Sequence, residues 1–92
     1  MTVFVLICGY TNVDSGDFST SVIGVFDSYE NAYKMMVKEI ESTRKDYEGY
    51  DTEEENFVEG DMSWSIWEKG EYPSHHCGLS IIEEIVLDGV AN

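Results

Sequence analysis

The sequence predicts an α+β fold, a mostly antiparallel sheet of about four strands with one long amphipathic helix packed across it. Two patterns support this prediction. Apolar or alternating segments typical of strands occur at residues 2–8, 20–26, 62–68 and 79–87. Between the second and the third of them, residues 27–45 carry apolar side chains at the helical period. We therefore expect residues 1–92 to form a single acidic α+β domain.

The N-terminal part of the chain predicts two strands joined by a turn or loop. Residues 2–8, TVFVLIC, are apolar on both alternating sides, which predicts a central strand that is buried on both faces. Residues 9–19 contain two Gly, one Asn and two Asp, a composition that predicts a turn or a long hairpin loop. Residues 20–26 form the second strand, where Gly24 marks a bulge or close packing against the helix.

The helix is expected to begin at Asp27. An acid at the N-cap with Glu30 three residues later resembles a capping box, and both acids suit the positive end of a helix. One apolar stripe follows, made of Tyr29, Ala32, Tyr33, Met36, Val37 and Ile40. Four of the five basic residues also lie on this helix, where glutamates four residues earlier can pair with two of them. The rest of the surface is therefore almost purely acidic.

The C-terminal part of the chain predicts two more strands. Residues 62–68, MSWSIWE, alternate apolar side chains with serines, the pattern of a half-buried strand. Trp67 falls on the serine side, which makes it a candidate for a dimer or partner contact. Residues 69–78 predict a turn, and residues 79–87 predict the final strand.

Residues 46–61, DYEGYDTEEENFVEGD, hold eight carboxylates and no Lys or Arg. The whole chain has nineteen acids against five bases and a net charge of −14. This charge disfavours direct binding to nucleic acid or to an anionic membrane. It favours a cationic partner, which can be a basic protein surface, a metal ion or a polyamine. Because three aromatic residues interrupt the acidic run, we expect it to lie against a folded domain.

Such an acidic surface can imitate the phosphate backbone of DNA. Carboxylates two apart on a strand are about 6–7 Å apart, and those three or four apart on a helix about 5–6 Å, similar to neighbouring phosphates. A surface with this spacing would occupy the cationic groove of a DNA-binding protein. The residues predicted to bind the partner in this way are Asp46, Glu48, Asp51, Glu53, Glu54, Glu55, Glu59, Asp61, Glu68 and Glu71.

In length, charge and the acidic run DYEGYDTEEENFVEGD, the chain resembles the anti-restriction nuclease (Arn) proteins of T-even phages. The segment VIGVFDSYENAYKMM also resembles generic small phage α+β domains. The first resemblance implies a homodimeric DNA mimic that acts in the host cytoplasm. Its implied partner is a host DNA-binding protein, such as a restriction nuclease directed at modified cytosine or a nucleoid protein. An acidic protein–protein interaction module unrelated to DNA mimicry is the alternative.

Enzymatic and metal-dependent functions have little support in the sequence. No Gly-rich phosphate loop or nucleophile motif occurs, so we expect neither an enzyme nor a cofactor. His75, His76 and Cys77 lack a second ligand pair, which favours a loop over a zinc site. An EF-hand starting at Asp51 would need Gly and Glu at positions that hold Asn56 and Met62. Adjacent acids in a strand point to opposite faces, which excludes Glu83 and Glu84 as an acid/base pair.

The sequence shows no pattern typical of a targeting signal. The first ten residues, MTVFVLICGY, are apolar but carry no basic n-region and no cleavage site. Two cysteines are too few for a disulfide framework, and no segment has the apolar length of a membrane span. We expect a cytoplasmic, reducing location.

Overall fold

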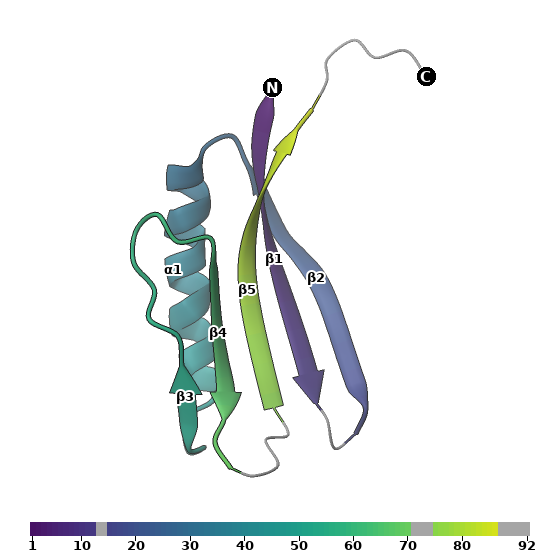
Figure 1. Ribbon diagram of the computed structural model, residues 1–92, viewed down its shortest axis with the longest axis vertical. Helices are drawn as coiled ribbons and strands as arrows, with labels where there is room; N and C mark the ends of the chain where they lie inside the picture. Colours follow the sequence, from purple (N-terminus) through teal and green to yellow (C-terminus); the bar gives the residue numbers. More distant parts are fainter. Residues whose placement is uncertain (13–14, 71–74, 87–92) are drawn as a thin grey trace.

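Five antiparallel strands and one helix form two layers in the computed structural model, which describes residues 1–12, 15–70 and 75–86. The strands stand in the order β2-β1-β5-β4-β3, with the helix α1 (Tyr29–Asp46) along the β3–β4 side of the sheet (Figure 1). Their bounds are β1 Thr2–Asn12, β2 Asp17–Phe26, β3 Thr52–Glu54, β4 Ser63–Glu68 and β5 His75–Ile85. The predicted α+β class is confirmed, with five strands in place of about four.

The first hairpin is longer than the sequence indicated. The loop expected at residues 9–19 is wrong, because β1 continues to Asn12 and β2 begins at Asp17. Here the cross-strand ladder outweighs the turn-forming composition. The register shifts opposite Leu6 and Ile7, so the expected bulge near Gly24 is present. A Cβ at Gly24 would lie 2.8 Å from the tip of the Phe26 ring, so a larger residue there would require this ring to move.

The helix begins one residue later than expected. Ser28, not Asp27, is the N-cap, and its hydroxyl oxygen accepts the backbone N–H of Asn31 at 3.2 Å. Asp27 instead accepts the side-chain amide of Asn31 at 3.1 Å. Glu30 consequently stands at the second helical position, so the expected capping box is wrong. Its carboxylate still lies in the first turn and is 3.6 Å from Lys34.

The hydrophobic core lies between α1 and one face of the sheet. The helix contributes the predicted stripe, of which Ala32, Met36 and Ile40 are buried. The sheet contributes Leu6, Trp64, Ile66, Cys77, Leu79 and Ile81. Trp64 is 1% exposed, so truncating it to Ala would cost about 3–5 kcal/mol of folding free energy.

The second face of the sheet, here called the open face, is covered by no helix or strand among the described residues. Its centre is apolar because Val5 pairs with Val25 on β2 and with Ile82 on β5, while Ile7 pairs with Val22. We call these five residues the apolar half. The expectation that β1 is buried on both faces is therefore wrong. One helix covers one face only, so Val5 and Ile7 of β1 are half-buried on the open face, and their neighbours Val25 and Ile82 are 62% and 40% exposed.

The loop predicted around His75–Cys77 is also wrong over the described residues. These residues begin β5 and pair with Asn12, Thr11 and Tyr10 of β1. Residues 71–74 and 87–92, including Glu71 and the end of the expected last strand, lie outside the described residues. Trp67 lies opposite His76 on the open face and is half-buried, in agreement with its predicted place on the serine side.

Candidate partner-binding surface

The acidic segment 46–61 follows α1 along its whole length. Gly49, with a φ of 91°, turns the chain after the helix, and β3 then pairs with β4. Residues 55–62 return beside the helix, as Figure 1 shows. At the helix start the Tyr29 hydroxyl donates to the Asp61 carbonyl at 2.7 Å and accepts the Gly60 N–H at 2.8 Å. The segment therefore spans about 27 Å, the length of an 18-residue helix.

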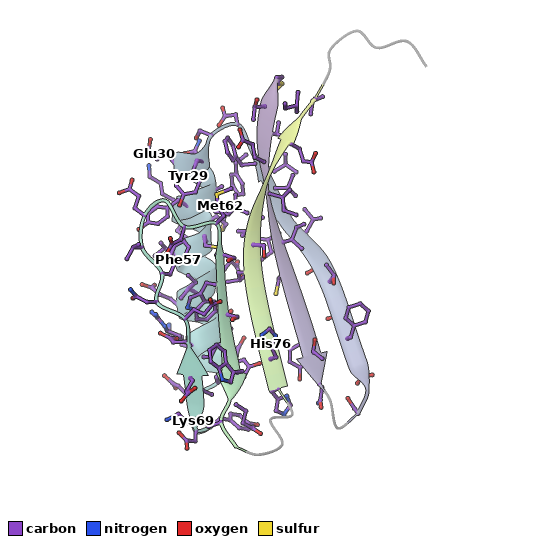
Figure 2. All side chains as sticks on the ribbon, in the orientation of Figure 1. Tyr29, Glu30, Phe57, Met62, Lys69 and His76 are labelled. Carbon is purple, nitrogen blue, oxygen red and sulfur yellow. The ribbon has the colours of Figure 1, made fainter. Side chains whose placement is uncertain are left out.

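Three carboxylates of this segment form what we call the acidic row, Asp51, Glu53 and Glu55. Alternation along a strand places them on the same side, at steps of about 6–7 Å. Oxygens of Asp51 and Glu53 both lie 3.9 Å from the Lys69 ammonium nitrogen. Glu55 Oε1 accepts the Ser65 hydroxyl at 2.7 Å. Figure 2 shows Lys69 beside β3, at the opposite end of the molecule from Glu30.

Glu54 points to the other side of β3 and has a structural partner. Its carboxylate accepts bonds from Arg44 Nε at 2.9 Å and from Arg44 Nη2 at 2.6 Å. This hydrogen bond raises the pKa of the Arg44 guanidinium above its ordinary value. The guanidinium also lies 5.9 Å from the centre of the Trp64 ring. Glu54 thus ties β3 to α1 and is less available to a partner than the acidic row.

The remaining predicted site residues are spread along the segment. Asp46 and Glu48 are exposed at the end of α1, and Glu59 is exposed in the 55–62 loop. Asp61 accepts the backbone N–H of Val58 at 3.0 Å, which closes a turn. Glu68 ends β4 opposite Thr52. Glu68 therefore alternates onto the helix-covered side of the sheet, toward Tyr47 and away from the acidic row, and Glu59 and Asp61 lie at the far end of the helix.

Sequence reasoning missed the two cations within this surface. Arg44 was expected to act within its own helix, and Lys69 was assigned no partner. Both reach carboxylates of the acidic segment instead. Glu54 follows Arg44 by ten residues and lies outside the helix, so the i,i+3 and i,i+4 spacing of helical ion pairs could not predict this contact. The eight carboxylates still outnumber the two cations by six.

Residues considered for metal binding or acid/base chemistry take other roles in the described part of the chain. Within residues 1–12, 15–70 and 75–86, no group of three or more His, Cys, Asp or Glu is placed to hold a metal ion. His75 Nδ1 is 2.8 Å from the Tyr10 hydroxyl. Glu83 and Glu84 pair with Phe4 and Val3, so they face opposite sides of the sheet.

A comparison with models of known protein families, with curated proteins and with solved structures finds no match to this chain. Among the described residues, no helix combines the length and the apolar character needed to cross a membrane.

Proposed function

We propose that this protein is a DNA mimic that inhibits a DNA-binding protein by occupying its DNA-binding surface. The partner class is a host nuclease, such as a modified-cytosine restriction nuclease, or a nucleoid protein. The observation that carries the proposal is the acidic row of Asp51, Glu53 and Glu55. Its spacing of about 6–7 Å is close to that of neighbouring phosphates on one DNA strand.

The ordered backbone beneath the acidic row supports this proposal. The Lys69 N–H donates to the Asp51 carbonyl at 2.8 Å, the Glu55 N–H donates to the Ser65 carbonyl at 2.9 Å, and Glu53 pairs with Trp67 between them. Glu54 and Arg44 hold the same strand against the helix. A charge array that is already ordered loses less conformational entropy on binding than a disordered tail would. The carboxylates of the whole segment 46–61 extend over about 27 Å, roughly eight base-pair steps of B-DNA.

We further propose that the protein acts as a homodimer, joined through the apolar half of the open face. Val22 and Val25 are each 62% exposed and Ile82 is 40% exposed, so the isolated chain leaves apolar side chains in water at the centre of this face. Apolar surface of this kind is stabilised when a second copy covers it. No charged residue belongs to the apolar half, so two copies with a charge of −14 each can meet there with least repulsion.

The alternative is an acidic module that binds a basic protein unrelated to DNA. Such a module would also use the acidic row, but it would not require the carboxylates to be spaced like phosphates. The two functions differ in whether duplex DNA competes for the partner. A scattered set of acids would favour the alternative, whereas the row along β3 favours mimicry.

The proposed function is tested by capture of proteins from a bacterial lysate on the immobilised chain, followed by elution with duplex DNA or with salt. We expect DNA-binding proteins to elute with DNA. The variant Glu53→Gln/Glu55→Gln should capture about tenfold less of them, because two charge-assisted contacts are lost while both side chains keep an acceptor oxygen.

A variant with the same change of charge serves as the control. Glu30→Gln/Glu41→Gln removes two carboxylates from exposed positions of α1 outside the predicted partner-binding set. It should capture nearly as much as the original chain. Captured proteins that stay bound in excess duplex DNA would contradict mimicry and favour the alternative module. If both variants lose the same amount of captured protein, binding depends only on the net charge of the chain and not on the position of the carboxylates.

A further inference from the structure

A cavity of about 420 Å³ lies between the C-terminal half of α1 and the sheet, on the face opposite the apolar half. The core ends here, because the sheet-facing side of the helix changes from Met36 and Ile40 to Thr43 and then Tyr47. A volume of this size falls within the range of small-ligand sites, about 300–1,000 Å³. Neither the fold nor the proposed inhibition requires this cavity.

Aromatic rings form a continuous wall of the cavity. The Tyr10 hydroxyl is 2.8 Å from His75 Nδ1, and the centre of the Tyr50 ring lies 5.9 Å from that of His75. Tyr47 meets Tyr50 edge to face at 6.3 Å. Electron-rich faces of several tyrosines around one space are the arrangement that attracts an organic cation.

Two carboxylates, Glu39 and Asp46, stand on the helix side of the same cavity. In the part of the chain that the structure describes, neither forms an ion pair with Lys or Arg. The hydroxyl-bearing residues Ser42 and Thr43 line the space between them. Burial raises the pKa of the Cys77 thiol to about 12, so the sulfur in this wall remains neutral. The cavity therefore offers negative charge, hydrogen-bond acceptors and aromatic rings, and its lining contains neither Lys nor Arg.

We propose that this cavity binds a primary alkylammonium group. A protonated amine has three N–H donors, which the carboxylates can accept, while its alkyl chain lies against the tyrosine rings. A quaternary ammonium has the same charge but no donors, so the carboxylates select against it. The group can come from a free diamine or from a lysine side chain that a protein presents. This site is separate from the acidic row and does not rest on the proposed inhibitor function.

The proposal is tested by NMR titration of the ¹⁵N-labelled full-length chain in buffered salt. The probes are 1,5-diaminopentane, N-acetyl-lysine methylamide and the Nε-trimethylated form of that lysine. We expect the largest shifts at the amides of Tyr47, Tyr50 and His75. The trimethylated probe should bind about tenfold more weakly than its parent, because it cannot donate hydrogen bonds to charged acceptors. Tighter binding of the diamine would indicate a free diamine, and equal or tighter binding of the lysine probe would indicate a protein side chain.

Matched variants separate the cavity from the general acidity of the chain. Asp46→Asn should weaken amine binding about tenfold, and Tyr50→Ala, at an exposed position, should weaken it about threefold. Glu30→Gln removes the same charge at the other end of α1, as Figure 2 shows, and should leave the affinity unchanged. The proposal is overturned if Asp46→Asn and Glu30→Gln weaken binding equally, if shifts map to the acidic row, or if the trimethylated probe binds as well.

Discussion

The two halves of the open face differ in what they present to a partner. On β2, β1 and β5 the face carries the five residues of the apolar half, and Glu84 lies beyond them on β5, opposite Val3. On β4 and β3 it carries serines, Trp67 and the acidic row. The same antiparallel sheet supports both halves, so the difference comes from the side chains alone. We infer that one face serves two contacts, with a second copy on the apolar half and a cationic partner at the acidic edge.

The two edges of the sheet show the same contrast. β3 has three residues, two of them glutamates, and short charged edges resist pairing with other strands. β2 has ten residues and Asp17 as its one charged side chain, and Phe18 beside it is 76% exposed. A long, nearly uncharged edge next to an apolar face is typical of a site of association. We therefore expect the proposed dimer to form on the β2 side of the molecule, away from the acidic edge.

The largest effect is expected from a charge placed in the apolar half. Ile82→Glu should weaken the dimer at least about 100-fold, because each copy would bury an unpaired carboxylate against an apolar surface. Val58→Glu, at a 54% exposed position in the 55–62 loop, introduces the same charge and should leave the dimer intact. Analytical ultracentrifugation measures both. A chain that is already monomeric at high micromolar concentration would contradict the dimer.

Salt is expected to move the two contacts in opposite directions. Raising the ionic strength should strengthen the dimer a few-fold, because screening reduces repulsion between two copies of charge −14. The same change should weaken capture of a cationic partner about tenfold or more. Sedimentation and partner binding measured over one salt series provide the comparison. If both contacts respond in the same direction, the division of the open face into two kinds of contact is wrong.

A smaller effect is expected where β3 is tied to the helix. Glu54→Gln should lower the free energy of unfolding by about 0.5–1 kcal/mol, since the pair with Arg44 is bidentate but largely exposed. The loss should shrink in high salt. Denaturant unfolding measures the change. Glu59→Gln, an exposed acid of the same segment, should change stability little, and an equal loss in that variant would refute a specific role for the Arg44 pair.

The sequence predicted the core well because the core follows local periodicity. The helical spacing of Ala32, Met36 and Ile40 and the alternation around Trp64 both place the correct side chains inside. It predicted that the acidic segment lies on the surface, because burying so many carboxylates away from water would cost too much desolvation free energy. The α+β class followed from the order of these elements.

Contacts between distant segments could not be read in the same way. The start of β5 at His75 depends on pairing with β1, more than sixty residues earlier, and its own composition favours a turn. Whether the second face of the sheet is covered depends on how many helices pack on the sheet. The apolar pattern of β1 gives no information about that number. The pairing of β3 with β4 decides which side of the sheet each acid faces. It turns Glu54 toward Arg44 and its neighbours Glu53 and Glu55 toward the open face, and the sequence alone does not give this register.

An effect similar in size to that of Glu54→Gln, but of opposite sign, is expected at Tyr47 on the covered side of the sheet. The Tyr47 hydroxyl oxygen is buried and has no hydrogen-bond partner among the described residues. Tyr47→Phe removes this unsatisfied group and should raise the free energy of unfolding at pH 7 by up to about 1 kcal/mol.

The same variant should also change the alkaline limb of the stability curve. Burial raises the pKa of Tyr47 from 10.0 to about 12. The unfolded chain therefore releases this proton first, and the stability contributed by the protonated hydroxyl is present below pH 10 and lost between pH 10 and about 12. Denaturant unfolding at pH 7, 9 and 11 should show the advantage of Tyr47→Phe growing at the highest pH. Cys77, whose pKa rises from 9.0 to about 12 for the same reason, adds a slope of the same sign that Tyr47→Phe leaves in place. An advantage that is constant across this range would mean that the Tyr47 hydroxyl is solvated in the folded protein.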